Sequence, residues 1–168
     1  MEPTIDQRLR AFWHECGAVP RSGLNRDQLA ACEHRLGRIL PSEIASFYLG
    51  VNGTRETGPE LFVAWPLGQV GSVPDVVSPF RGIPDYGDVA RFLPEAADYF
   101  AFADSMIWSN IFAVRLSTAV NTTTQVVWLC GSSYAVVAPT FVEFWERYLA
   151  NPSKVLCPAA STIRSPAG

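Results

Sequence analysis

Apolar residues recur every three or four positions in three early segments of the chain. These segments cover residues 5–16, 25–37 and 41–51. This spacing places the apolar side chains on one face of a helix, so it predicts three amphipathic helices. We expect the third helix to end at Asn52 and Gly53, because both residues accept the left-handed conformation that a helix end needs.

Capping residues support two of these helices and predict a fourth near the C-terminus. In each case a polar side chain stands just before the helix, and Gln or Glu follows three positions later, so that free backbone N–H groups can be satisfied. The pairs are Thr4 with Gln7, Asn25 with Gln28, and Thr140 with Glu143. The helix after Thr140 has a broad aromatic face, from Phe141 to Leu149, which we expect to pack on a sheet.

Between the third and the last helix, the pattern changes to short runs rich in aromatic and β-branched residues. Gly, Pro, Asn or Ser residues bound these runs, which is typical of an antiparallel sheet. The runs are residues 61–65, 99–103, 111–116, 125–130 and 134–138. The last two form the clearest hairpin, because Gly131, Ser132 and Ser133 separate them. The predicted fold class is α+β, with N-terminal helices, a central, mainly antiparallel sheet of about five or six strands, and a C-terminal helix packed on the sheet.

Two segments have no clear pattern. Residues 68–93 are rich in Pro, Gly and Asp, and a loop of this length is either functional or contains short elements. Residues 151–168 are rich in Ser, Pro and Ala, so we expect an extended C-terminal tail with a frayed end. The chain is therefore interpreted as a single domain over residues 1–150, followed by a tail.

Composition favours one packed domain. Of the 168 residues, 48% are hydrophobic and 17% are charged, which argues against disorder. No apolar run approaches the about 18 residues of a membrane span, and the first ten residues lack the profile of a secretory signal. The sequence therefore predicts a cytoplasmic protein with no membrane partner. The cysteines have no regular spacing, and we expect reduced thiols at Cys16, Cys32, Cys130 and Cys157.

Charge is distributed unevenly along the chain. The formal net charge is -3 and no two Lys or Arg residues stand next to each other, which argues against direct binding of nucleic acid. Between Pro74 and Asp104, six acids and two arginines give a net charge of -4. The acids are Asp75, Asp85, Asp88, Glu95, Asp98 and Asp104, and the arginines are Arg81 and Arg91. This central region predicts a surface for a basic protein partner, because complementary charge speeds encounter.

Several segments resemble one known family. Residues 33–47 read EHRLGRILPSEIASF, and Asn52 and Gly53 follow. Further on come Trp65-Pro66-Leu67, then YFAFAD at 99–104 and FVEFWERYL at 141–149. In this order the segments resemble the SMI1/KNR4 family of the SUKH superfamily over residues 4–150. The family's tight turn after the residue matching Asp104 usually contains glycines, whereas this chain has Ser105-Met106-Ile107-Trp108-Ser109-Asn110.

The resemblance implies that the protein acts by binding another protein, but it does not identify the binding residues. Bacterial members of this family are often immunity proteins that bind and neutralise polymorphic toxins, many of them nucleases. Some eukaryotic members act as regulatory scaffolds. The family shares no catalytic residues, and its partner surfaces vary between members.

Candidate metal ligands are His14, Cys16, Cys32 and His34. Their types suit zinc, but the members of each pair are two positions apart on a predicted helix. Such side chains point about 200° apart, so one helix cannot offer both to a single ion. We therefore expect packed thiols and surface histidines, with no metal and no cofactor.

Candidate catalytic groups are few. Cys130, Ser132 and Ser133 are possible nucleophiles by type, but no histidine follows His34 to activate them. Asp85 and Asp88 could act as an acid and a base, although carboxylates in a Pro- and Gly-rich loop more often form turns. We expect no catalytic residues. An enzyme that uses residues 68–93 as a pocket wall is an alternative.

The leading hypothesis is a protein-binding module, an immunity protein that neutralises a toxin. A nuclease toxin is the natural basic partner. The alternatives are a regulatory scaffold and the enzyme just described. Trp108 stands in a polar-edged turn beside Met106 and Ile107, where an exposed aromatic can anchor a partner. The predicted partner-binding residues are Asp75, Asp85, Tyr86, Asp88, Asp104 and Trp108.

Overall fold

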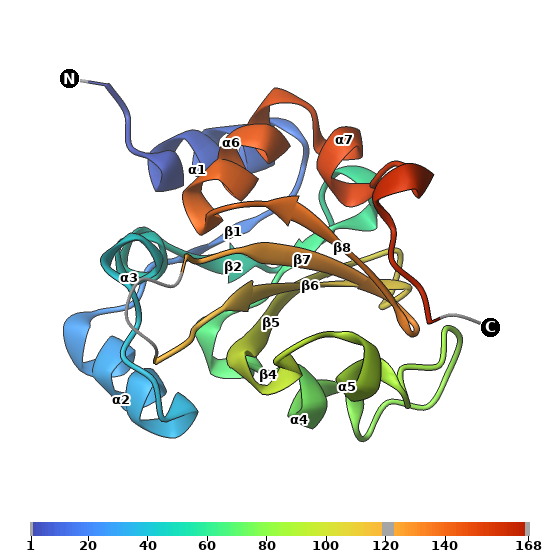
Figure 1. The fold of residues 1–168 in the computed structure, drawn as a ribbon. Helices are drawn as coiled ribbons and strands as arrows, with labels where there is room; N and C mark the ends of the chain where they lie inside the picture. Colours follow the sequence, from blue (N-terminus) through green and yellow to red (C-terminus); the bar gives the residue numbers. More distant parts are fainter. Residues whose placement is uncertain (1, 119–122, 167–168) are drawn as a thin grey trace.

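A six-stranded antiparallel sheet forms the centre of the protein (Figure 1). The computed structural model describes residues 2–118 and 123–166. The strands are β3 (Val63–Ala64), β4 (Gly71–Ser72), β5 (Tyr99–Ser105), β6 (Asn110–Arg115), β7 (Val126–Cys130) and β8 (Ser133–Ala138). Strands β5 to β8 are neighbours in chain order, and both short strands, β3 and β4, pair with β5. The predicted α+β class and antiparallel sheet are confirmed.

The predicted hairpin is formed by β7 and β8. Cys130 pairs with Ser133, so only Gly131 and Ser132 lie in the turn. Gly131 has a φ of +59°, a left-handed conformation that suits a two-residue hairpin turn. Sequence reasoning therefore places this hairpin correctly.

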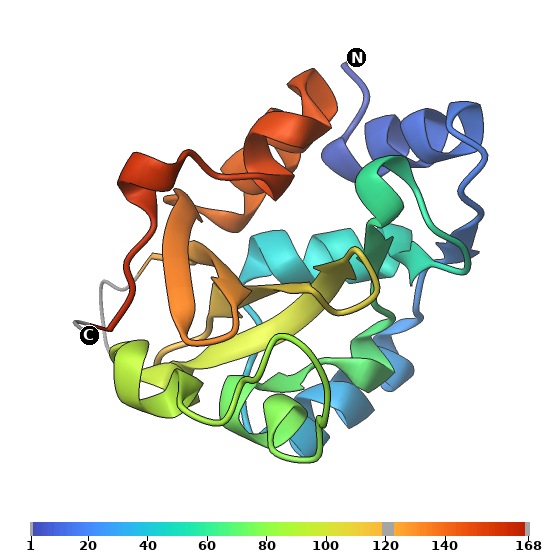
Figure 2. The ribbon, with the colours of Figure 1, turned by 90° about the vertical axis from the view of Figure 1, so that its right-hand side faces the viewer.

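Helices cover both faces of the sheet. Figures 1 and 2 show α1, α3 and α6 on one side and α4 and α5 on the other. The helices are α1 (Ile5–Glu15), α2 (Arg26–Leu36), α3 (Ser42–Gly50), α4 (Val73–Val77), α5 (Val89–Phe92), α6 (Phe141–Ala150) and α7 (Pro152–Leu156), with short 3-10 turns η1 (Pro59–Leu61), η2 (Leu67–Gln69), η3 (Ala96–Asp98) and η4 (Ala160–Thr162). The predicted caps at Asn25 and Thr140 are present, since each side chain accepts an N–H group of the first helical turn.

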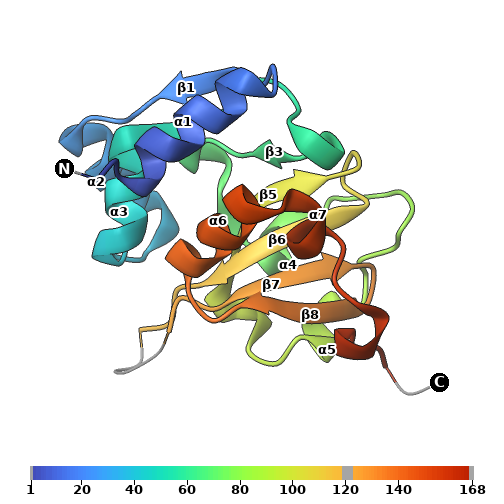
Figure 3. The same cartoon turned by 90° about the horizontal axis from the view of Figure 1, so that it is seen from above.

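The first core lies between the sheet and α6, and it is strongly aromatic. Phe144 of α6 meets Phe102 of β5 edge to face at 5.4 Å between ring centroids, and it lies 5.7 Å from Phe112 of β6. Trp145 turns toward Trp13 of α1 at 5.7 Å. Figure 3 shows α6 lying across the strands with α1 beside it. The C-terminal helix therefore packs on the sheet as predicted, and Trp13, Trp128 and Trp145 are all buried.

The second core lies on the opposite face and is built from smaller side chains. Ala101 and Ile111 of the sheet pack against Val73 and Val77 of α4 and Val89 of α5. Side chains of a strand alternate between the two faces, so each central strand contributes to both cores. The segment 68–93, which has no clear pattern in the sequence, therefore contains the short elements that cover this face.

The expected end of the third helix is wrong. This helix ends at Gly50, and Asn52 and Gly53 belong to strand β2 (Val51–Thr54), which pairs with β1 (Pro20–Ser22). Gly53 does have a left-handed φ of +75°, but a Cβ there would lie 2.4 Å from the carbonyl oxygen of Ala64. Glycine is needed for close approach of two strands and not for a helix end.

The C-terminal segment differs from the expected extended tail. Residues 152–156 form α7, whose Val155 and Leu156 are buried in the first core. Farther on, Arg164 exchanges two backbone hydrogen bonds with Tyr134 at the outer edge of β8. Apolar residues at 155 and 156 anchor the segment, and its backbone covers part of an edge strand.

No helix in the described part of the chain is long and apolar enough to cross a membrane.

Candidate functional site

A stack of three aromatic rings lies at one end of the second core. Trp65, which follows β3, stacks on Trp108 with 5.0 Å between ring centroids, and Phe80, which follows α4, also stacks on Trp108 at 5.6 Å. Tyr86 meets Phe80 edge to face at 5.4 Å. Two segments, one at Trp65 and one at Phe80 to Tyr86, thus meet at Trp108, which is half-buried.

Asp104 fixes two residues of this stack through hydrogen bonds. The carboxylate is 5% exposed and accepts the indole N–H of Trp65 at 2.6 Å and the backbone N–H of Trp108 at 3.1 Å. Burial raises the pKa of Asp104, while the two donated hydrogen bonds act in the opposite direction. Because it is buried and bonded, Asp104 fixes the positions of Trp65 and Trp108 and does not face a partner.

Tyr86 has a similar supporting role. Its ring is buried, and its hydroxyl donates to the carbonyl oxygens of Trp108 and Ser109 at 3.0 and 3.1 Å. Burial raises the pKa of Tyr86, so the hydroxyl stays protonated and acts as a donor. The side chain therefore fastens segment 68–93 to the turn between β5 and β6.

That turn has an unusual backbone. Met106, Ile107 and Trp108 have φ values of +54°, +54° and +63°, three left-handed residues in a row. Each costs about 1–2 kcal/mol relative to a relaxed backbone, and the cost is highest for a β-branched residue such as Ile107. The turn is closed by a hydrogen bond from the N–H of Ser109 to the carbonyl of Met106. The turn therefore holds large side chains at a cost in backbone strain.

The strained turn exposes apolar side chains. Ile107 is 81% exposed and Met106 is 49% exposed, while Trp108 folds back onto Trp65. Strain of this kind persists only when the surrounding structure enforces it, and it is concentrated at functional sites. The contacts of Asp104 and Tyr86 with the turn supply that enforcement.

Three hollows surround the aromatic stack. One of about 500 Å³ is lined by Trp65, Gln69, Asp75, Val76, Pro79 and Trp108. An adjoining hollow of about 300 Å³ shares three of these residues and adds Phe80 and Ile107. The third, of about 610 Å³, lies on the other side of Phe80 and includes Arg81, Asp85 and Tyr86. We call the surface formed by the first two of these hollows and the exposed turn the Trp108 surface.

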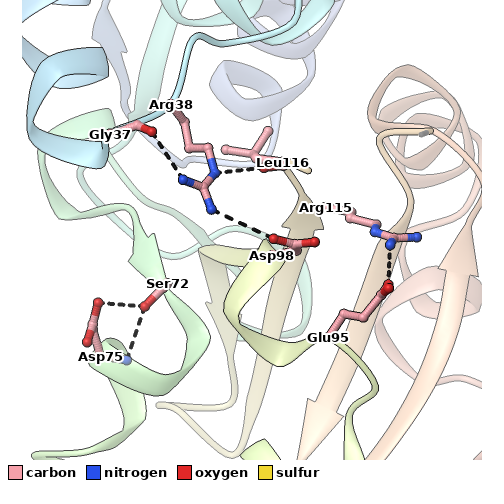
Figure 4. A network of polar contacts seen from close by, with 8 residues as sticks. All are labelled: Gly37, Arg38, Ser72, Asp75, Glu95, Asp98, Arg115 and Leu116. Carbon is pink, nitrogen blue, oxygen red and sulfur yellow. Dashed lines mark hydrogen bonds and ion pairs between the residues drawn. The ribbon is translucent and has the colours of Figure 1, made fainter. Parts of the chain in front are cut away.

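The acidic character of the central region is weaker than its sequence implies. Three of the six acids form ion pairs with arginines, and Figure 4 shows two of these pairs. The pairs are Asp88 with Arg91, Glu95 with Arg115, and Asp98 with Arg38. Among the described residues, the exposed acids of this region outside ion pairs are Asp75, which accepts a hydrogen bond from Ser72, and Asp85, which accepts the N–H of Gly87.

The six predicted partner-binding residues are therefore brought near one another but have different roles. Asp75 and Trp108 line the same hollow, and Asp85 and Tyr86 line the hollow on the other side of Phe80. Asp88 is exposed and paired, and Asp104 lies beneath the stack. Sequence reasoning missed Phe80 and Val76, although an aromatic residue between prolines in a polar segment is a usable signal.

The other candidate groups do not assemble into a reactive site. His14, Cys16 and His34 are exposed and Cys32 is half-buried against the first core, so the expectation of a packed thiol is wrong for Cys16. Within residues 2–118 and 123–166, no three His, Cys, Asp or Glu side chains are grouped as metal ligands. Burial raises the pKa of Cys130, which disfavours its nucleophilic thiolate form.

Several polar side chains of residues 33–47, the segment that resembles the family, make structural hydrogen bonds. Glu33 accepts the N–H of Leu40 at 2.8 Å, and Arg35 donates to the carbonyls of Leu67 and Val70. Arg38 donates to the carbonyl of Leu116 (Figure 4). Its guanidinium also lies over the ring of Phe100, 5.5 Å from the ring centroid. These contacts fix the connection between α2 and α3 and join it to η2 and to the end of β6, so the residues named have a structural role.

Comparison with known proteins agrees with the fold. No curated protein matches the chain. The model of the SMI1 / KNR4 family (SUKH-1) matches residues 23–147, from just before α2 to within α6. The match covers well over half of the chain, including the whole six-stranded sheet and the Trp108 surface. The chain therefore belongs to the SMI1/KNR4 family, SUKH-1.

Proposed function

We propose that this protein works by binding another protein through the Trp108 surface, as an immunity protein that neutralises a toxin. The observation that carries the proposal is the β5–β6 turn, which holds Ile107 and Met106 in solvent at the expense of a left-handed backbone. Membership of the SMI1/KNR4 family supports the immunity role. A nuclease is the class of toxin that family resemblance favours.

The Trp108 surface has the properties of a binding hot spot. Hot spots are often aromatic side chains in well-packed pockets, and contacts that contribute little energy surround them and exclude water. Here Trp108 and Phe80 are fixed by stacking, and Ile107 projects beside them. A surface ordered before binding loses little conformational entropy on association, which favours affinity.

Binding also accounts better than catalysis for segment 68–93. The enzyme alternative requires a pocket formed by this segment, and the hollow of about 610 Å³ is that pocket. Its described ionisable lining residues are Arg81, Asp85 and Tyr86. The guanidinium of Arg81 donates to the carbonyls of Ser78 and Phe80, and the Tyr86 hydroxyl is committed to the β5–β6 turn. These groups stabilise the segment, so we propose that the protein is not an enzyme.

The test is neutralisation of a toxic protein encoded beside this chain. Cells that express the toxin should grow when they also express the chain, and the two purified proteins should form a stoichiometric complex. A regulatory scaffold would bind partners without rescuing growth. Growth arrest that persists despite folded, abundant chain would contradict the immunity role, and a bound metabolite in the purified protein would favour the enzyme alternative.

A further inference from the structure

The hollow of about 500 Å³ beside Trp108 has one charged wall and several apolar walls. Trp65, Trp108, Val76 and Pro79 form the apolar part, and Asp75 forms the charged part. Asp75 is exposed, and its contact with the Ser72 hydroxyl engages Oδ2. Oδ1 is thus available for a second donor. A carboxylate beside aromatic and aliphatic walls suits a ligand with an apolar stem and a cationic end.

A second carboxylate adds negative potential beneath the hollow. Asp104 is bonded to two residues that line the hollow, since one oxygen accepts the indole N–H of Trp65 and the other accepts the backbone N–H of Trp108. Both oxygens therefore act as acceptors, the arrangement that suits an ionised carboxylate. A buried charge acts through protein of low dielectric constant and is felt more strongly than an exposed one.

Nearby cations do not neutralise these two acids. Arg81 lines the hollow on the far side of Phe80, where its guanidinium donates to two backbone carbonyls. Arg91 pairs with Asp88, and Arg115 pairs with Glu95. In the described part of the chain, neither Asp75 nor Asp104 forms an ion pair.

We infer that this hollow receives an arginine side chain of the partner protein, with the methylene stem against Val76, Pro79 and the aromatic rings and the guanidinium on Asp75. This inference rests on the proposed function and names the chemistry that its partner must present. The adjoining hollow, with Phe80 and Ile107, then contacts an apolar residue beside that arginine. Lysine fits less well, because its ammonium is more strongly hydrated and lacks the planar fork that matches a carboxylate.

The experiment is an NMR titration of the folded, ¹⁵N-labelled chain with three small probes. N-acetyl-arginine amide is the test probe, N-acetyl-citrulline amide is its neutral control of the same shape, and N-acetyl-lysine amide tests the choice of cation. The readout is the indole N–H signals of Trp65 and Trp108. We expect saturable shifts with the arginine probe, weaker binding of the lysine probe, and none with the citrulline probe.

Two variants locate the site. Asp75→Asn should weaken binding of the arginine probe by at least about tenfold, because the charge-assisted hydrogen bond is lost. Asp85→Asn is the matched control, since Asp85 is also exposed and outside an ion pair but lines a different hollow. This control should bind the probe as the unmodified chain does.

The inference is wrong if the arginine probe gives no saturable shifts, if citrulline binds as well as arginine, or if Asp75→Asn has no effect. The titration needs no toxin, so its failure is distinct from failure of the proposed function. A chain that neutralises its toxin but ignores the arginine probe would keep the immunity role and overturn this inference.

Discussion

The two faces of the sheet differ in how completely their aromatic side chains are buried. The face under α6 is covered by interlocking rings, with Trp145 in contact with residues of α1, α3 and β5. The face under α4 and α5 has more small aliphatic side chains. Four of its aromatic rings gather at one end, where Phe80 and Trp108 are only partly buried. One face closes off from solvent, and the other ends in an exposed apolar surface.

We expect the first face to contribute mainly to stability and the exposed end of the second face to contribute mainly to binding. A fully buried ring gains its whole transfer free energy inside the protein, whereas a half-exposed ring leaves part of that free energy for a partner. The strained turn fits the same scheme, because its left-handed backbone costs stability and positions Ile107 outside. We expect mutations on the first face to unfold the protein and mutations at the Trp108 surface to weaken binding.

The largest expected effect is on the first face. Trp145→Ala should lower the free energy of unfolding by about 3–5 kcal/mol, because it removes a fully buried ring at the centre of the core. Phe80→Ala should cost about 1–2 kcal/mol, since that ring is only partly buried. Urea denaturation of both variants measures the loss in free energy of unfolding. Equal losses would contradict the contrast between the two faces.

The next largest effect is at Ile107, where one substitution should stabilise the fold and weaken partner binding. Ile107→Asn should raise the free energy of unfolding by about 0.5–1 kcal/mol, because Asn tolerates a left-handed backbone better than Ile does. The same change should weaken partner binding by about 2 kcal/mol, as expected when a hot-spot side chain is lost. Denaturation and calorimetric titration with the partner give the two values. A loss of stability would show that the turn is not strained as described.

A smaller effect concerns the pH dependence of stability. Burial raises the pKa of Asp104 above its ordinary value of 3.8, so the folded state holds this proton more tightly than the unfolded chain. Stability should therefore fall as pH rises from near 3.8 through the raised pKa. Asp104→Asn should remove this part of the slope, measured by urea denaturation between pH 3 and pH 7. An unchanged slope would exclude Asp104 as its source.

The smallest effect is at a surface ion pair. Asp88 and Arg91 are both largely exposed, with 3.4 Å between their charged atoms. Asp88→Asn should change the free energy of unfolding by less than about 0.5 kcal/mol, because exposed pairs are screened by water and salt. Partner affinity should change as little. A large loss of affinity would extend the binding surface toward α5 and revive the acidic interface that the sequence predicts.

Local signals explain what could be predicted from the sequence. The cap at Asn25, the aromatic stripe after Thr140 and the turn at Gly131 each depend on residues close together in the chain, and each was placed correctly. Helices α4 and α5 have five and four residues, too few for a helical period to emerge. The second covered face of the sheet was therefore missed.

Long-range contacts explain what could not be predicted at the site. The charge of Asp104 predicts a place at a partner surface, but the side chain is buried against Trp65, which lies 39 positions earlier in the chain. The role of Tyr86 depends on two carbonyl groups of the β5–β6 turn, which no local pattern reveals. The large side chains of that turn are visible in the sequence, whereas its left-handed backbone is not.

The most direct test compares two exposed isoleucines. Ile107 is 81% exposed on the Trp108 surface, and Ile39 is 88% exposed between α2 and α3. Ile107→Glu and Ile39→Glu place the same charge at sites of similar exposure, and the affinity of each folded variant for the toxin is measured together with its ability to restore growth. We predict that Ile107→Glu abolishes binding and rescue while Ile39→Glu retains both. Retained binding by Ile107→Glu, or equal loss in both variants, would contradict the assignment of the Trp108 surface as the interface.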